Sequence, residues 1–250
     1  MVPFSGKSKV IVRMPYKPIP IGFKVWVMAQ QGYFLQWNWH ERGNGSVGVP
    51  SHVFAGKPLA NTQAVVAYLL SKLPPPPSSA HGYHADNLFV TIPLIKLFRE
   101  RGTATTGTTR VRGGIGNKFV SLKKEDDRKD FIPWGTTYSR PTKDQKVMHF
   151  AWKDNALVLL LSTYFDGLEE DIPRMRRCPS TTSSSAKTAR VPFAGEFSEE
   201  LPIPQFIDDY NHHMGGVDIG DRLRASYNWD RRTRRGGWRA IAFLFLLEPI

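Results

Sequence analysis

Residues 84–110 read HADNLFVTIPLIKLFRERGTATTGTTR and predict a helix between two strands. A strand signal over 82–90 ends in Asp86-Asn87. Thr91 is suited to the N-cap of a helix over 92–101, with a proline in its first turn. The Thr-rich stretch 103–110 has the composition of a second strand. Because ligands gather at strand ends in sheets of this kind, Asp86 is a candidate site residue.

The segments before this stretch predict a hairpin and a helix. Residues 1–20 are Pro-rich and irregular. Aromatic and β-branched runs at 23–29 and 33–41 flank Gln30-Gln31-Gly32 and are typical of a β-hairpin. Residues 59–73 have a helical apolar pattern, with Pro58 suited to the first turn and the four prolines at 74–77 ending the helix.

The segments after residue 110 predict a mixture of irregular chain, strands, a linker and helices. Residues 111–146 are polar and glycine-bearing, so we expect an irregular excursion. The remaining segments each have a pattern of their own: strands over 147–152 and 157–163 joined at Lys153-Asp154-Asn155, a low-complexity mobile linker over 179–190, and helices over 203–229 and 238–247. A hairpin followed by this alternation predicts an α/β fold with a mixed sheet flanked by helices. It lacks an opening strand before Phe23 to pair with the hairpin.

Composition narrows the class of protein. The 250 residues include 34 Lys+Arg and 22 Asp+Glu, a net charge of +12, and 41% are hydrophobic. Wholesale disorder is excluded by the apolar fraction, and a disulfide framework by the single cysteine, Cys178. No apolar run approaches the ~18–20 residues of a membrane span, and the N-terminus lacks the apolar region of a secretory signal. We expect an intracellular, soluble, basic protein.

The positive charge is concentrated at two places. Residues 1–85 hold eight Lys or Arg against one acid, Glu41. A second group of arginines near the C-terminus is our candidate DNA-binding set. It comprises Arg222, Arg224, Arg231, Arg232, Arg234, Arg235 and Arg239. Clustered basic residues attract polyanions, and nucleic acid is the commonest large one; a solvated basic surface is the alternative.

Two further acids are candidate site residues. Asp218 and Asp221 are three apart in MGGVDIGDRL (214–223) and would share one face of a helix. Together with Asp86 they offer the carboxylate oxygens that Mg²⁺ prefers. The alternative is a turn or N-cap role for Asp86 and a solvated helix face for the other two. Gly215-Gly216 would weaken a helix here unless they begin it or allow another backbone to approach closely.

Four segments, in order along nearly the whole chain, resemble sequence blocks of the PiggyBac transposases and their domesticated derivatives. The four are MVPFSGKSKVIVRMPYKPIPIGFKVW (1–26), HADNLFVTIPLIKLFRERGTATTGTTR (84–110), VMHFAWKDNALVLLLST (147–163) and IDDYNHHMGGVDIGDRLRASYNWDRRTRRGGWRAIAFLFL (207–246). They match, in turn, the start of the family's catalytic domain, its second-aspartate block, its W-x-D-x-x-x-V-x-x-L-S-T segment and its Y-N-x-x-M-G-G-V-D-x-x-D block.

The resemblance implies a ribonuclease-H-like fold with an insertion between the second and third acidic positions. It implies cut-and-paste DNA transposition at TTAA targets with Mg²⁺. By position, Asp86 matches the second catalytic aspartate and Asp218 the third, and these two would be the metal ligands; Asp221 matches an additional aspartate. Arg110 falls on the arginine of the family's G-T-x-R element, and no catalytic role is assigned to it.

The resemblance also implies how the chain divides into parts, which partners it has and where in the cell it acts. Residues 1–110 would be the N-terminal part of the ribonuclease-H-like domain, 111–200 an insertion and linker, and 201–250 a C-terminal helical part. The implied partner is DNA, with a possible homodimer and with neither a membrane nor a small-molecule substrate. The implied location is the nucleus, for which RRTRR (231–235) offers a basic patch.

One family position has no counterpart in these residues. The family's first catalytic aspartate lies just upstream of the element that contains Met1, on a strand that would precede it. Residues 1–40 contain neither Asp nor Glu. We therefore expect a catalytically incomplete remnant of reduced stability. The alternatives are a non-catalytic DNA-binding or chromatin-associated protein, and an active transposase whose gene prediction is truncated upstream of Met1.

Two histidines receive only a structural interpretation. His212 and His213 are adjacent, so on a helix they point different ways and make a poor metal-binding pair.

Overall fold

The computed structural model describes residues 1–4, 7–41, 48–74, 82–180 and 186–226. The chain divides into two compact units, Met1–Pro75 with Gly215–Ile250, and Pro76–Met214. Each is described by itself. Among the described residues, no helix combines the length and the apolar character that crossing a membrane would need.

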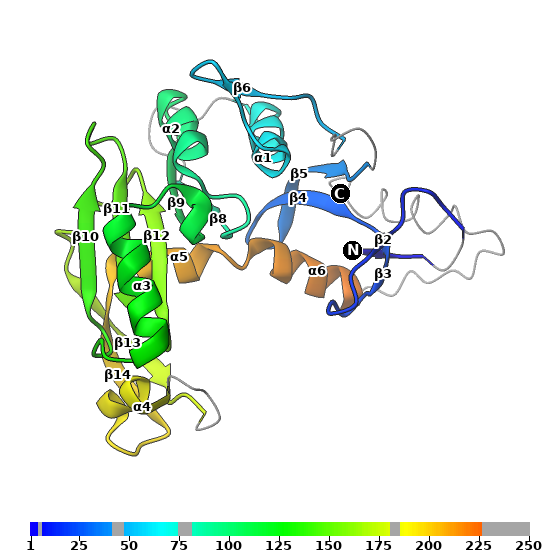
Figure 1. Ribbon diagram of the computed structural model, residues 1–250. Coiled ribbons are helices and arrows are strands. Elements are labelled where there is room, and N and C mark those ends of the chain that lie inside the picture. The colour runs from blue at the N-terminus through cyan, green and yellow to red at the C-terminus, as the bar shows by residue number, and fades with distance from the viewer. Residues whose placement is uncertain (5–6, 42–47, 75–81, 181–185, 227–250) are drawn as a thin grey trace. The chain divides into compact units, whose positions relative to one another are not determined.

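A five-stranded mixed sheet forms the centre of the unit 76–214 (Figure 1). Its strands, in spatial order, are β10 (Thr137–Pro141), β11 (Met148–Lys153), β12 (Leu157–Ser162), β9 (Ala104–Thr108) and β8 (Gly82–Ala85). β8 and β9 are parallel and all other pairs are antiparallel. A parallel pair needs a crossover, which α2 (Ile92–Glu100) supplies. The predicted α/β class with a mixed sheet and helices is confirmed.

The sheet is buried on both faces because alternate side chains of its central strands enter different cores. On β11, Ala151 joins an apolar cluster with Ile95 of α2 and Phe119 of α3 (Asn117–Lys129). Its neighbour Phe150 joins the opposite cluster and stacks on Phe206 of α5 (Gln205–His213), with ring centroids 4.2 Å apart. The side-chain period of two in a strand therefore fixes which helix lies on which face.

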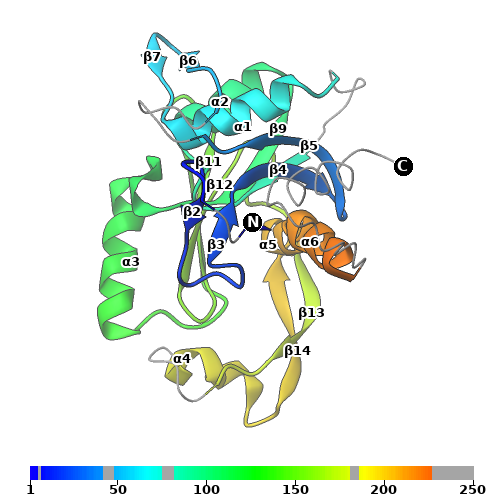
Figure 2. The ribbon, with the colours of Figure 1, turned by 90° about the vertical axis from the view of Figure 1, so that its right-hand side faces the viewer.

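A two-stranded ribbon extends from the same unit. β13 (Asp171–Arg177) and β14 (Ser198–Pro204) pair along their whole length. Figure 2 shows α4 (Ala186–Arg190) near one end of the ribbon and α5 at the other. Two short 3₁₀ turns complete the unit, at Val111–Gly113 and Val191–Phe193.

Three sequence expectations for this unit are wrong. Residues 111–146 are not an irregular excursion, since they contain α3 and β10. Residues 186–190 of the expected linker are helical. The helix expected from residue 203 begins at Gln205 and ends at His213, because 203–204 complete β14 and Gly215 precedes a separate helix.

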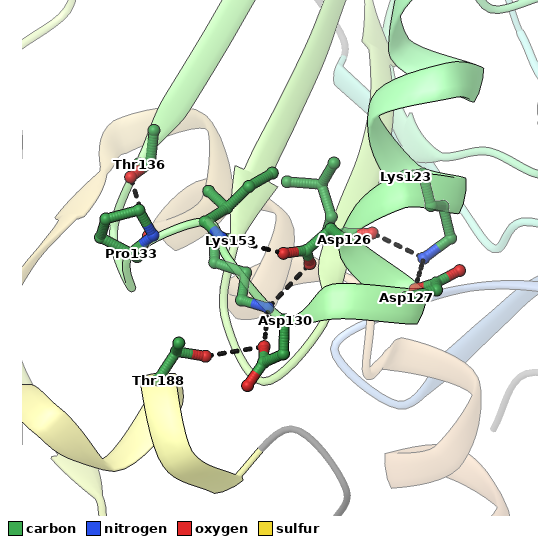
Figure 3. Close-up of polar contacts among 10 residues, drawn as sticks. Lys123, Asp126, Asp127, Asp130, Pro133, Thr136, Lys153 and Thr188 are labelled. Carbon is green, nitrogen blue, oxygen red and sulfur yellow. Dashed lines mark hydrogen bonds and ion pairs between the residues drawn. The ribbon is translucent and has the colours of Figure 1, made fainter.

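A buried ionic network joins α3, β11 and α4 (Figure 3). Lys153 Nζ donates to Asp126 Oδ2 at 2.7 Å and to Asp130 Oδ1 at 2.6 Å. Thr188 Oγ1 donates to Asp130 Oδ1 at 2.7 Å, and Ile132 N–H to Asp126 Oδ1 at 3.1 Å. Each charge thus has a partner, which is what makes its burial tolerable. Burial alone would lower the pKa of Lys153, but the two carboxylates outweigh it and raise that pKa.

The described residues of the other unit form short strands and two helices. Strands β1 (Val2–Pro3), β3 (Ile21–Phe23) and β2 (Val12–Arg13) form one sheet in that order, so residues 1–20 are not wholly irregular. The other elements are the hairpin β4 (Val25–Gln30) and β5 (Tyr33–Trp39), the hairpin β6 (Val53–Phe54) and β7 (Lys57–Pro58), α1 (Asn61–Ser71) and α6 (Gly216–Ser226). Pro58 is therefore in a strand and not in the first turn of α1, which begins three residues later.

The predicted hairpin over 23–41 is confirmed as β4–β5. Gln31 and Gly32 form its two-residue turn, and both have positive φ, +49° and +93°. Positive φ at both positions matches the right-handed twist of the strands, and glycine adopts it without strain.

Candidate active site

Asp86 lies directly after β8, at the carboxyl end of a strand in a parallel pair. The residue is exposed, and its Oδ1 accepts a hydrogen bond from Leu88 N–H at 2.8 Å. Its backbone C=O accepts a hydrogen bond from Phe89 N–H at 3.0 Å. The turn role considered for Asp86 is thus present, and it occupies one carboxylate oxygen. The strand end orients an exposed carboxylate at the sheet edge where α/β proteins bind ligands.

Asn87 and Arg110 connect the two strand ends of this edge. Arg110 Nε donates to Asn87 Oδ1 at 2.9 Å, and the two residues follow β8 and β9 respectively. The arginine of the G-T-x-R element therefore holds the loop that carries Asp86.

Asp218 and Asp221 both lie on α6, as the spacing predicts. Asp218 is exposed in the first helical turn, where the helix dipole favours a negative charge. Asp221 is half-buried, and its Oδ1 accepts a hydrogen bond from Arg224 Nη2 at 2.8 Å. A predicted catalytic acid and a predicted DNA-binding arginine are thus paired with each other on one helix.

Glycines let α6 lie directly against the β4–β5 turn. Gly216 is the first residue of α6, and a Cβ there would lie 3.0 Å from Ala29 O. At Gly220 a Cβ would lie 2.3 Å from the Phe34 ring and 2.7 Å from Gly32 O. Both reasons considered for the glycine pair therefore hold, since Gly216 begins the helix and a second backbone approaches it closely.

A second polar cluster, which the sequence interpretation missed, lies between β8 and α5. His84 Nε2 is 2.6 Å from Asp209 Oδ2, and His213 Nδ1 is 3.2 Å from Asp209 Oδ1. The two imidazole rings are stacked, with centroids 4.8 Å apart. Burial lowers the pKa of His84, and the hydrogen bond to Asp209 acts in the opposite direction. Asp209 and His213, four residues apart on a helix, are the local signal that could have revealed it.

Comparison with known proteins decides the family. A model of a DDE-type transposase family, described as Transposase IS4, matches residues 1–249. The chain belongs to this family. A comparison with curated proteins gives no match.

This transposase-family chain is also similar to a solved structure, a piggyBac transposase in a synaptic complex with hairpin DNA. The two are 21% identical with a TM-score of 0.64, and the match covers 98% of this chain and 42% of that one. The chain thus spans less than half the length of that transposase, and the likeness shows a shared fold. The resemblance to PiggyBac transposases stated above is confirmed.

The predicted site residues are divided between the two units. Asp86 belongs to the unit 76–214, whereas Asp218 and Asp221 belong to the other. DDE-type transposases generally use a divalent metal ion, and exposed carboxylates such as Asp86 and Asp218 have the donor chemistry for one. Of the arginines proposed to contact DNA, Arg222 is exposed and Arg224 half-buried; the others lie outside the described residues.

Proposed function

We propose that these 250 residues form a DNA-binding domain of a PiggyBac-type transposase that does not by itself cleave DNA. The observation that carries the proposal is the family match over residues 1–249, with Asp86 exposed at the end of a parallel strand. The domain would be ribonuclease-H-like in its finer topology, with the strand of the first aspartate not among its strands. Its ancestral reaction would be transposition at TTAA targets.

The carboxylates fit the metal that such a reaction uses. Asp86 and Asp218 would hold Mg²⁺, with Asp221 beside them, since each offers the oxygen ligands that this ion requires. In phosphodiester cleavage, a pair of such ions would supply activation of the attacking oxygen and stabilisation of the leaving one. Asp221 shares its carboxylate with Arg224 at 2.8 Å, so it is less available than exposed Asp218.

Cleavage by these residues alone is not expected because the acids are too few. Residues 1–85 contain a single acid, Glu41, which follows β5 and precedes Asp86 by 45 positions. The family's reaction needs three carboxylates that converge. A chain that supplies only the later ones should retain affinity for DNA and lose hydrolytic activity.

Positive charge supports DNA as the partner. The chain has a net charge of +12, with seven arginines between Arg222 and Arg239. Phosphate contacts by such residues supply affinity that does not depend on sequence. We place the protein in the nucleus on the same grounds, and a homodimer is compatible with the function.

DNA affinity against salt tests the binding half of the proposal. Fluorescence anisotropy with a TTAA-containing duplex should give a linear decrease of log K with log salt, of slope about −0.9 for each phosphate contact. Charge reversal at Arg222, which is exposed, should weaken binding and reduce the slope by about 1. Affinity that is independent of salt would contradict DNA binding.

A strand-cleavage assay tests the catalytic half. Hairpin and nicked substrates with TTAA flanks, incubated with the purified chain and Mg²⁺, should remain uncut. Robust cleavage that Asp86→Ala abolishes would show instead an active transposase. DNA that is bound but left uncut is the result that the proposal expects.

A further inference from the structure

We propose that His84, Asp209 and His213 bind one zinc ion, at a site separate from the transposase carboxylates. One ligand atom from each side chain can be chosen so that all three lie within 4.8 Å of one another. His84 lies on β8 and the other two on α5, so the site would join strand and helix across 125 positions of sequence. The inference goes beyond DNA binding and does not depend on it.

The scaffold around these side chains is held from several directions. Phe206, Ile207 and Tyr210 of α5 are buried in the core beneath the sheet. Tyr210 Oη lies 3.1 Å from Thr108 Oγ1, which holds the middle of α5 against β9. A site on rigid elements keeps its ligands near their working geometry, so little order has to be created on binding.

The beginning of α5 is held as well. Arg174 of β13 makes two hydrogen bonds to the Asp208 carboxylate, at 2.6 and 2.8 Å. Asp208 is the neighbour of the ligand Asp209 in sequence, so this bidentate contact restrains the helix turn that carries it. The helix that carries Asp209 and His213 is therefore held in place along its length.

The donor set selects the kind of ion. Two imidazoles and one carboxylate form the ligand set of three-ligand zinc sites, which leave a fourth position for water. Mg²⁺ prefers oxygen ligands and octahedral geometry, so it would be a poor occupant here. The carboxylates of Asp86 and Asp218 offer oxygen ligands only, so they would favour Mg²⁺ over Zn²⁺.

The distances agree with an ion that enters between the ligands. Zinc bonds of about 2.0–2.2 Å in a tetrahedron place ligand atoms about 3.4 Å apart. The pair His84 Nε2 and Asp209 Oδ2, at 2.6 Å, would open slightly. His213 Nδ1 lies 3.2 Å from Asp209 Oδ1, near this spacing, and 2.9 Å from the backbone O of Asp209, a hydrogen bond that an ion at Nδ1 would replace. Asp209 presents a different oxygen to each histidine, Oδ2 to His84 and Oδ1 to His213, while the two rings stack on each other. An ion would replace the proton that one of the rings now shares with the Asp209 carboxylate.

Cobalt titration of the whole chain tests the proposal. After dialysis against a chelator, the protein should bind one equivalent of Co²⁺ with the intense visible absorption of a four-coordinate ion, and Zn²⁺ should displace it. His84→Gln, Asp209→Asn and His213→Gln should each weaken binding by more than about tenfold, the loss that an outer-shell partner alone can cause.

Two matched variants locate the ion. His212→Gln changes an exposed histidine on the same helix that is not among the three ligands, and it should leave Co²⁺ binding unchanged. Asp86→Asn and a large excess of Mg²⁺ should also leave it unchanged, because the transposase carboxylates are a different site. Binding that His212→Gln or Asp86→Asn weakens as much as His213→Gln would overturn the assignment.

A stability measurement guards against variants that do not fold. Zn²⁺ should raise the unfolding temperature of the wild type and of His212→Gln, because it binds the folded state. It should leave the unfolding temperature of His213→Gln unchanged, while circular dichroism shows that this variant is folded. Absence of any Co²⁺ spectrum in folded wild-type protein would refute the proposal.

Discussion

Two ionic clusters of the unit 76–214 differ in the solvent exposure of their side chains. In the Lys153 network, the side chains of Lys153 and Asp126 are each 1% exposed. In the His84 cluster, the side chains of His84, Asp209 and His213 are 11%, 31% and 44% exposed. A charge sealed from water must keep its partners, whereas a half-open cluster can exchange a proton for another cation. The first arrangement therefore serves stability, and the second is suited to binding.

The pKa shifts follow the same division. Burial lowers the pKa of a cation in both places, but two carboxylates reverse the effect at Lys153 and raise its pKa. At His84 a single carboxylate does not reverse it, and the pKa is lowered. The two carboxylates at Lys153 thus outweigh burial, whereas the one at His84 does not.

The largest expected effect comes from removing the buried cation. Lys153→Met leaves Asp126 buried with no cation beside it, and should lower the free energy of unfolding by about 3–5 kcal/mol. Urea denaturation followed by circular dichroism measures the loss. As a control, Lys129→Met removes an exposed lysine paired with Glu125 and should change the same quantity by at most about 0.5 kcal/mol. Equal losses for the two variants would erase the distinction between the clusters.

The same substitution made once in each cluster sharpens the comparison. Asp126→Asn weakens the contact with Lys153 and should lower the free energy of unfolding by about 1.5–3 kcal/mol, the usual worth of a hydrogen bond to a charged group. Asp209→Asn, in metal-free buffer, should cost under about 1 kcal/mol because water screens the half-open cluster. A larger loss at Asp209 than at Asp126 would reverse the proposed roles.

Acid should weaken the buried network gradually. Burial would raise the pKa of Asp130, but the hydrogen bonds from Lys153 and Thr188 prevail and lower it. A lowered carboxyl pKa gives stability that is present above the unfolded-state value of 3.8 and is lost as the pH falls through the folded-state value. The stability difference between wild type and Asp130→Asn should therefore shrink as the pH falls below about 4.

A pH series of urea denaturations measures this difference. Asparagine is the suitable replacement because residue 130 has a φ of +47°, which asparagine tolerates better than most residues. A difference that is constant between about pH 6 and pH 2.5 would show that the Asp130 charge does not contribute.

The smallest effect is expected at the edge of the network. Thr188→Val removes the hydroxyl that donates to Asp130 Oδ1 at 2.7 Å, and should lower the free energy of unfolding by about 0.5–1.5 kcal/mol. Thr136→Val, whose hydroxyl donates to Pro133 O at an exposed turn, is the matched control and should stay within about 0.5 kcal/mol. Matching values would indicate that α4 gains nothing from its contact with the buried charges.

Sequence predicted the elements whose pattern is local. The hairpin β4–β5 has a turn glycine between apolar runs, and α2 has a proline in its first turn and an apolar face. By contrast α3 was missed, because its sequence NKFVSLKKEDDRK is polar and places a charged residue, Asp126, on the buried face beside Phe119. A helix that buries an ion pair does not show the apolar stripe by which helices are recognised.

The site residues that sequence predicts are likewise those whose pattern is local. Asp86 was predicted because a strand end and its acid are adjacent in sequence, and Asp218 with Asp221 because their spacing fits a helix. The cluster of His84, Asp209 and His213 is not predicted, since His84 and Asp209 are separated by 125 positions and meet only through the packing of α5 on the sheet. Periodicity reports on one element at a time, so contacts between elements require the structure.

The glycines of α6 have a consequence for where the acids of that helix can be. Because α6 contacts the β4–β5 turn through glycines 216 and 220, it fits against this turn at only one position along the helix axis. Advancing it by four residues, about 6 Å, would bring Arg224 to the position of Gly220, where a single added carbon already lies 2.3 Å from the Phe34 ring. The β4–β5 turn therefore determines where Asp218 and Asp221 lie along the axis of α6. What fixes these acids along the helix axis is the absence of side chains at residues 216 and 220.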